Sequence, residues 1–172
     1  MAKGRPLAAF RATILTWGAL DGGPMLEDYP VVIEVPVRWG DQDSLAHVNH
    51  IVYLQYFETV RIEYLMRLGM DPPGPNWRES GAIIASVTCR YLAPVTFPDT
   101  LALGARISHM GTDRLTMEHA AFSTRLARPA ARSTANLVWY DYITGHRRPI
   151  PQEVRQAIIA LEGQEPPAPP AH

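Results

Sequence analysis

The segment GDQDSLAHVNHIVYLQYFETVRIEYLMRLGM, residues 40 to 70, decides the fold of this 172-residue chain. From residue 50 onward its apolar side chains recur at intervals of three and four residues, which is the spacing of one face of an α-helix. That face consists of large apolar residues: Tyr53, Phe57, Val60, Tyr64 and Leu68, with Leu54 and Leu65 at its margins. Because few polar residues interrupt the run, we predict a helix over residues 50–69 that is buried on most sides.

Strand-like segments lie on both sides of this helix. Residues 31–39 precede it and are rich in β-branched side chains. Four further segments with strand composition follow it, separated by short turns: 82–94, 100–110, 115–126 and 135–143. Short turns join antiparallel neighbours, so we predict a meander in which consecutive strands pair.

The order of these elements defines an α+β domain over residues 25–162. A sheet can cover one long apolar helix by curling around it, which would account for a helix with so few polar positions. The domain closes with a short helix over 151–163, from Pro151 in its first turn to Gly163 at its end.

Two terminal segments lie outside this domain. Residues 1–24 end in the breaker Gly22-Gly23-Pro24, so we expect a dispensable N-terminal extension. Its apolar part is interrupted by Arg11, which argues against a secretory signal. Residues 163–172 are rich in proline, and we expect them to form a flexible tail.

Composition excludes several classes of function. The formal net charge is -1, so nothing indicates a nucleic-acid partner or an anionic membrane surface. No apolar run approaches the ~20 residues that span a bilayer. Cys89 is the only cysteine, which excludes intramolecular disulfides and cysteine-based zinc sites. A single cysteine also favours a reducing, cytoplasmic location.

The polar residues in front of the long helix form the candidate site. They comprise two carboxylates, two imidazoles and one amide: Asp41, Asp43, His47, Asn49 and His50. A structural role is the simplest interpretation, because Asp often accepts hydrogen bonds from turns and Asn49 suits a helix N-cap. The two histidines and Asp43 could also share a metal ion, but no third histidine-rich element accompanies them, so we expect no metal.

Residues 37–61, VRWGDQDSLAHVNHIVYLQYFETVR, resemble the signature of hotdog-fold thioesterases of the 4-hydroxybenzoyl-CoA thioesterase-like group. That signature has Asp-x-Asp, often Gly-His-Val-Asn-Asn, and then Tyr-Leu and Phe-Glu in a helix. The segments YLAPVTFPDTL and VWYDYITGHRRPIP also resemble the family, so the likeness covers roughly residues 31–160. It implies a hotdog fold, in which a curved antiparallel β-sheet wraps around one long central α-helix. Ala46 departs from the family, because glycine is usual there and can adopt a backbone that alanine tolerates poorly.

The resemblance implies an acyl-CoA thioesterase, which hydrolyses a thioester to a free acid and coenzyme A. Asp43 matches the catalytic carboxylate, as base or nucleophile. His47 and His50 match histidines of two different branches, so the pattern does not assign the role to one of them. The helix N-terminus would favour an oxyanion, and we place Asn49 and Tyr53 among the substrate-binding residues.

The resemblance also sets expectations about cofactors and partners. No cofactor is expected, because coenzyme A is part of the substrate, although acyl carrier protein could take its place as the thiol carrier. Family members form homodimers or homotetramers with sites at the subunit boundary, so we expect a homo-oligomer. Two alternatives remain: a hydratase of the same fold, and a non-catalytic acyl-thioester binding module, which Ala46 favours.

A second group of candidate residues is basic. Arg125, Arg128 and Arg132 lie in a stretch that has no acidic residue between positions 121 and 140. Guanidinium groups match phosphates well, so these arginines could bind the phosphates of coenzyme A. The alternative is an exposed hairpin tip without a ligand.

Overall fold

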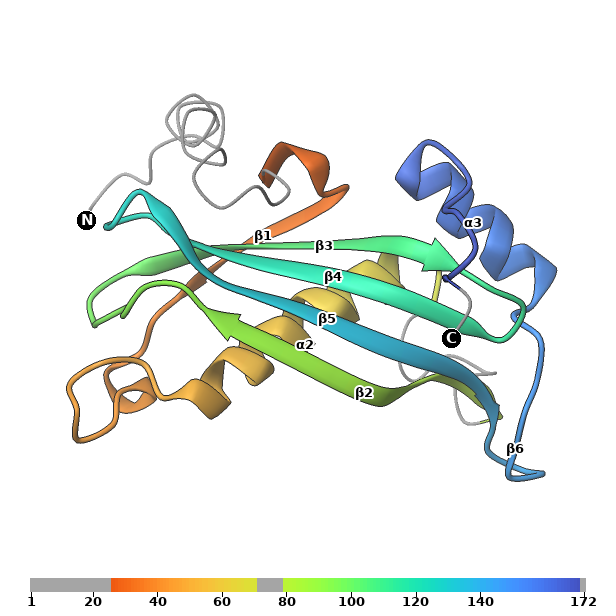
Figure 1. The fold of residues 1–172 in the computed structure, drawn as a ribbon, viewed down its shortest axis with the longest axis horizontal. Coiled ribbons are helices and arrows are strands. Elements are labelled where there is room, and N and C mark those ends of the chain that lie inside the picture. The colour runs from red at the N-terminus through yellow and green to blue at the C-terminus, as the bar shows by residue number, and fades with distance from the viewer. Residues whose placement is uncertain (1–25, 71–78, 171–172) are drawn as a thin grey trace.

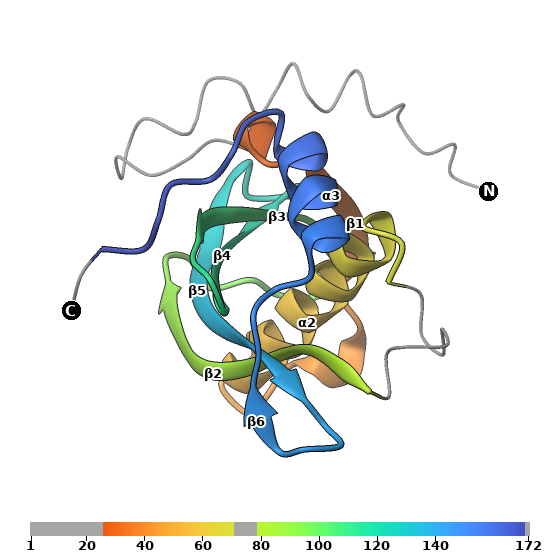
Figure 2. The same cartoon turned by 90° about the vertical axis from the view of Figure 1, so that its right-hand side faces the viewer.

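A single antiparallel sheet surrounds one long helix in the computed structural model, which describes residues 26–70 and 79–170. The elements are β1 (Val31–Pro36), α2 (His50–Arg67), β2 (Ser80–Tyr91), β3 (Thr100–Met110), β4 (Arg114–Ser123), β5 (Arg128–Asp141), β6 (His146–Arg147) and α3 (Gln152–Glu162). Short 3-10 turns cover Leu26–Asp28 and Trp39–Asp41. Figure 1 shows α2 running behind the sheet, and Figure 2 shows the sheet curving around it. The predicted α+β hotdog fold is confirmed. The predicted extension 1–24 lies outside the described residues.

The strand order corrects the predicted meander. The sheet runs β1-β3-β4-β5-β2, with β6 paired to β5, so β2 lies at an edge and pairs with β5 rather than with its sequence neighbour β3. Residues 92–99, which connect β2 to β3, are long enough to cross the end of the sheet. Backbone bonds at Leu92 and Val95 tie this connection to β5 and to the loop before α2, so it does not form a hairpin.

Helix α2 begins where the sequence predicts. Asn49 is its N-cap, and its side-chain oxygen accepts a hydrogen bond from Ile51 N–H. The buried face contains Tyr53, Tyr56, Phe57, Val60 and Tyr64. The prediction that most of the helix is buried is wrong for the single chain. A second apolar face is exposed and includes Ile51, Leu54, Ile62 and Met66.

Several predicted boundaries also move. The first strand ends at Pro36 instead of residue 39, because the chain then turns through Trp39–Asp41. Strand β5 begins at Arg128, so most of the turn expected over 127–133 is strand. Strand boundaries depend on pairing with neighbouring strands, and the composition of one segment does not reveal that pairing.

Helix α3 is tied to the core by its last residue. The Glu162 carboxylate accepts hydrogen bonds from Tyr64 Oη at 2.5 Å and from Ile107 N at 2.6 Å. Gly163 then adopts a left-handed conformation with φ 76° and ends the helix as predicted. The Pro-rich segment beyond it follows the domain surface, where Met110 N donates to Pro167 O at 2.9 Å.

Candidate active site

The loop between β1 and α2 is held in place by the connection that crosses from β2 to β3. Val48 N donates to Val95 O at 2.8 Å, and Phe97 N donates to the Gln42 side chain at 3.0 Å. Asn49 N donates to Asp41 O at 2.9 Å and closes the loop on itself. The segment that carries the candidate residues is therefore fixed on two sides.

Asp41 has a structural environment. It is buried and accepts hydrogen bonds from Tyr56 Oη at 2.6 Å and from Arg38 N at 2.7 Å. The Arg38 guanidinium lies 3.3 Å from the same carboxylate. Burial raises the pKa of Asp41, but the Tyr56 and Arg38 hydrogen bonds outweigh it and hold this pKa below its usual range.

Asp43 is half-buried and keeps free hydrogen-bonding capacity. One carboxylate oxygen accepts from Leu45 N at 2.8 Å, and the other receives a longer contact of 3.3 Å from Asn49 Nδ2. Because a carboxylate can accept about four hydrogen bonds, Asp43 can also bind a water molecule or a substrate group. Its backbone carbonyl accepts from Ala46 N at 3.0 Å, which forms a tight turn.

The start of α2 keeps a free backbone donor, the N–H of His50. Asn49 takes up two of the first N–H groups, since its side chain accepts from Ile51 N and its carbonyl from Val52 N, each at 3.0 Å. Among the described residues, no acceptor faces the N–H of His50. This free donor thus belongs to the residue that follows Asn49, and Asn49 contacts the Asp43 carboxylate directly.

Neither imidazole contacts Asp43 within the part of the chain that the structure describes. The His47 Nδ1 lies 3.0 Å from Leu45 O, and because a carbonyl oxygen only accepts, Nδ1 is the donor in this contact. His50 is exposed, and its ring packs edge-on against Tyr91 with centroids 6.4 Å apart. Which histidine serves the site is thus not decided by a bond to the carboxylate.

Tyrosines form the wall next to the helix start. Tyr91 Oη donates to His50 O at 3.1 Å, and its ring lies 5.4 Å from that of Tyr53. Tyr53 is buried, which raises its pKa to about 12 and keeps the phenol neutral. Tyr53 is among the residues predicted from the sequence, whereas Tyr91 is not. The signal for it was a tyrosine at the end of the strand-like segment 82–94.

Ala46 has the backbone that the family comparison anticipated. Its φ is 60°, in the left-handed region that glycine adopts without strain. We therefore expect Ala46→Gly to raise the free energy of unfolding by up to about 1 kcal/mol, measured by urea denaturation. As a control, Ala160→Gly on the exposed side of α3 should lower it by about 1 kcal/mol. Equal destabilisation by both changes would contradict this account.

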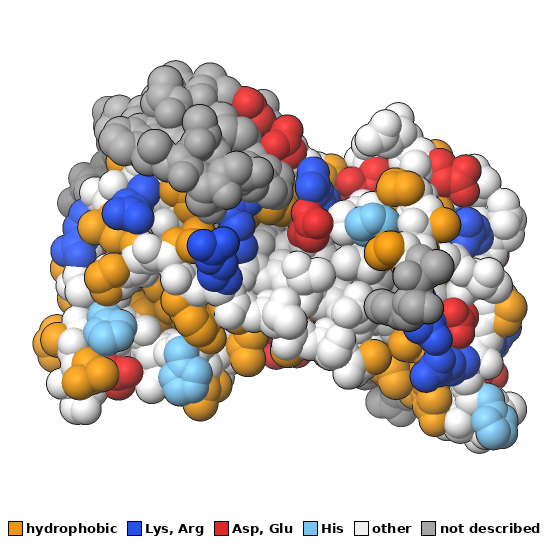
Figure 3. Space-filling model, in the orientation of Figure 1, with side chains coloured by type: hydrophobic (Ala, Val, Ile, Leu, Met, Phe, Trp, Pro, Cys, Tyr) orange, Lys and Arg blue, Asp and Glu red, His pale blue; other side chains and the backbone are white. Residues whose placement is uncertain are grey.

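The three candidate arginines do not form one cluster. Arg125 donates to the Thr96 hydroxyl and Arg128 to Leu92 O at 3.4 Å, so both contact the connection that supports the site loop. Arg132 instead lies opposite Ala120 in the register of β4 and β5, on the outer face of the sheet. Its positive charge lowers the pKa of the Tyr29 phenol, against the larger effect of burial. Figure 3 shows basic side chains gathered at the end of the molecule that carries the β4–β5 turn.

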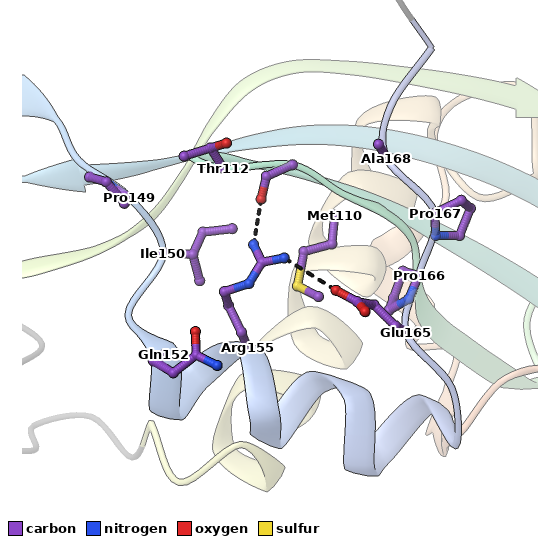
Figure 4. Close-up of a pocket in the computed structure, with 11 residues that line it drawn as sticks. Met110, Thr112, Pro149, Ile150, Gln152, Arg155, Glu165, Pro166, Pro167 and Ala168 are labelled. Carbon is purple, nitrogen blue, oxygen red and sulfur yellow. Dashed lines mark hydrogen bonds and ion pairs between the residues drawn. The ribbon is translucent and has the colours of Figure 1, made fainter.

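No metal-binding group is evident in the described residues, where no three His, Cys, Asp or Glu side chains converge. A groove of about 690 Å³ lies at the other end of β3, between α3 and the Pro-rich segment. Figure 4 shows Arg155 spanning it, bonded to Gly111 O at 2.7 Å and paired with Glu165 at 3.4 Å. Because Gly111 O and Glu165 already bind the Arg155 guanidinium, we assign this groove no part in the chemistry. No helix in the described ranges is long and apolar enough to cross a bilayer.

A curled antiparallel sheet around one long helix defines the hotdog fold. The family model of the Thioesterase-like superfamily matches residues 37–158, and the chain belongs to this family. It is a thioester hydrolase.

Known proteins resemble this chain over most of its length. A Thermus thermophilus thioesterase, solved in complex with coenzyme A and Zn, is 34% identical, with a TM-score of 0.70; the match covers 80% of this chain and 98% of that one. The PA5185 protein of Pseudomonas aeruginosa is 32% identical over 84% of this chain and 98% of that one, with a TM-score of 0.71. The Arabidopsis thaliana acyl-acyl carrier protein thioesterase ATL3 is 27% identical over 85% of this chain and 76% of its own.

Proposed function

We propose that the chain hydrolyses acyl-CoA thioesters with Asp43 as its catalytic carboxylate. The observation that carries this proposal is the contact of Asp43 with Asn49, the N-cap residue that directly precedes the free His50 N–H of α2. Thioester hydrolysis needs a base or nucleophile and a donor for the carbonyl oxygen, and these two groups provide both. Asn49 would orient Asp43, and Tyr53 would line the acyl side of the site.

The reaction follows from these roles. Asp43 accepts a proton from water as the water oxygen bonds to the thioester carbonyl carbon. The carbonyl oxygen becomes an anion, stabilised by His50 N–H and the positive end of the α2 dipole. The C–S bond then breaks, and the leaving thiolate takes the proton from Asp43. If Asp43 instead attacks the carbonyl carbon directly, the C–S bond breaks, the thiolate leaves and an anhydride forms. Water then hydrolyses this anhydride to the free acid and the Asp43 carboxylate, and the proton released goes to the thiolate. Of the two histidines we propose His50 as the site residue, since the His47 ring is held by Leu45.

A thiol-release assay on a panel of acyl-CoAs tests this function. Release of free coenzyme A and acid supports hydrolysis. Addition of water to an enoyl-CoA without thiol release would favour the hydratase alternative, and binding without turnover would favour a non-catalytic module. The proposed reaction uses no cofactor. We also propose a cytoplasmic location, on the ground that Cys89 is the only cysteine.

The thiol carrier is proposed to be coenzyme A, held by Arg125 and Arg128 next to the site loop. A similar solved structure was obtained with coenzyme A, whereas a curated relative is named for acyl carrier protein. Parallel assays with an acyl-CoA and the matching acyl carrier protein thioester separate the two carriers by kcat/KM.

We expect Arg128→Ala to raise KM for acyl-CoA more than it lowers kcat, because the phosphates lie far from the reacting carbon. The effect should shrink as salt is added, since screening weakens exposed charge contacts. Acyl-pantetheine, which lacks the adenosine phosphates, should be hydrolysed equally by wild type and variant. Arg114→Ala, at the opposite end of the sheet, is the matched control. Equal loss on both substrates would assign Arg128 a structural role.

We further propose that the chain forms a homodimer or a homotetramer. Strand β2 is a long edge strand, and its Ile84 and Val87 are each 42% exposed beside the exposed apolar face of α2. An uncovered edge and apolar patch of this kind favour pairing with a second copy. Light scattering at micromolar concentration should report a dimer or larger, and Val87→Lys should weaken it. A fully active wild-type monomer would contradict this proposal.

A further inference from the structure

Two buried polar side chains face α2 without partners. Among the described residues, neither ring nitrogen of His119 has a hydrogen-bond partner, and neither does the Ser133 hydroxyl. Their exposures are 1% and 4%. Buried polar groups are nearly always paired, because an unpaired one loses its hydrogen bonds to water. Two such groups in one place therefore call for a ligand or water that would complete them.

His119 and Ser133 lie side by side on the inner face of the sheet. They are directly paired across β4 and β5, and Cys89 on β2 pairs with Ser133 in the same row. The His119 ring packs on Phe57 of α2 with centroids 5.4 Å apart, so the row faces the helix. Burial and the nearby Arg61 charge lower the pKa of His119 to about 3, so the ring is neutral, with one donor and one acceptor nitrogen.

This row lies on the same inner face of the sheet as the tyrosine wall of the proposed site, farther along β2 and α2. Tyr91, whose hydroxyl donates to His50 O, is 46% exposed. Cys89 lies two residues earlier in β2, farther from the helix start, and is half-buried. On the helix, Leu54 is 36% exposed and follows His50 by one turn. The inner face of β5 offers only small side chains here, namely Ala131, Ser133 and Ala135. An acyl group that enters beside His50 would thus run toward Ser133.

Distances along the elements set the depth of the polar groups. Tyr91 and Cys89 are two positions apart in β2, which corresponds to about 7 Å along the strand. His50 and Phe57 are seven positions apart in α2, which corresponds to about 10 Å along the helix axis. A medium-length acyl chain with its carbonyl at His50 N–H is therefore long enough to reach the depth of Cys89 and Phe57, the neighbours of Ser133 and His119.

We infer that His119 and Ser133 form the inner end of the acyl site and select acyl groups that carry a hydroxyl oxygen at their far end. This inference rests on the proposed acyl-CoA hydrolysis and adds the substrate class. A hydroxyl group both donates and accepts, so it can form one hydrogen bond with an imidazole nitrogen and another with the serine hydroxyl. Arg61 adds positive charge nearby, with a side chain that is 11% exposed and an ion pair to Glu58 at 3.1 Å. An alkyl terminus would leave all these groups unpaired.

The test compares kcat/KM for hexanoyl-, octanoyl- and decanoyl-CoA with that for their ω-hydroxy counterparts. Wild type should prefer the hydroxylated substrate by about tenfold at one chain length, the effect of one buried hydrogen bond. In Ser133→Ala and His119→Leu this ratio should fall toward one. Met117→Leu, on the same face of β4, is the matched control and should keep the wild-type ratio.

The outcomes separate this inference from the function on which it rests. Hydrolysis of both series at equal kcat/KM, or a preference that survives both substitutions, would overturn the inference and leave the proposed function standing. Absence of hydrolysis with every acyl-CoA would overturn the proposed function and the inference together. A ratio lost equally in Met117→Leu would show that packing, rather than the polar groups, sets the preference, and would also overturn it.

Discussion

Asp43→Asn is expected to lower kcat by roughly 100- to 10,000-fold without lowering the temperature of unfolding, because a positioned base contributes about that factor. Asparagine keeps an oxygen that can accept the 2.8 Å bond from Leu45 N, so the turn should survive. What is lost is the group that takes the proton from water or attacks the carbonyl. Steady-state kinetics by thiol release, combined with thermal unfolding, measures both quantities.

The neighbouring Ser44 provides the control for this change. Its side chain is exposed, so Ser44→Ala should leave kcat within about twofold of wild type, as is usual for surface substitutions. A loss below tenfold in Asp43→Asn at unchanged stability would end the catalytic role of Asp43. A large loss that is accompanied by unfolding would instead make Asp43 a structural residue.

The helix and the Asp43 region could be predicted because both are local features. A repeat of three and four residues and a capping asparagine define α2 without knowledge of the rest of the chain. Asp43 stands at a fixed spacing from Asn49, and that spacing alone places it beside the helix start. Hydrophobicity could not show whether Ile62 and Met66 are covered by this chain or by another, so the extent of burial was overestimated.

Long-range contacts account for what the sequence did not reveal. The pairing of β2 with β5 depends on where residues 92–99 cross, which strand composition does not encode. Tyr56 was left off the predicted buried face, and its reason for burial is a bond to Asp41, fifteen positions earlier. His119 occupied an inward position between Met117 and Ala121 in the strand pattern, which was the available signal for a buried polar group.

The second large effect concerns stability and Asp41. Asp41→Ala removes the acceptor of Tyr56 Oη and of Arg38 N and leaves the Tyr56 hydroxyl buried without that partner. We expect the free energy of unfolding to fall by about 3 kcal/mol, the usual cost of breaking a buried charged network. For a domain of this size, the midpoint of thermal unfolding should then drop by roughly 10 °C. Urea denaturation and calorimetry measure the two values.

Tyr56→Phe tests whether the loss arises from that network. It removes one donor and keeps the ring, so it should cost about 1–2 kcal/mol. Combined with Asp41→Ala it should cost less than the sum of the two changes, because the 2.6 Å bond is shared. Additive costs in the double variant would mean that the bond contributes little and that Asp41 acts through Arg38 alone.

The pH dependence of stability gives an independent check on the sign of this effect. Hydrogen bonds from Tyr56 and Arg38 outweigh burial and keep the pKa of Asp41 in the folded chain below that in the unfolded chain. The stabilisation is therefore complete above the unfolded pKa of about 4 and is lost as pH falls through the lower folded value. The stability difference between wild type and Asp41→Asn should accordingly be constant near neutral pH and shrink below about pH 4. A difference that grows on acidification would mean that burial, rather than hydrogen bonding, dominates at Asp41.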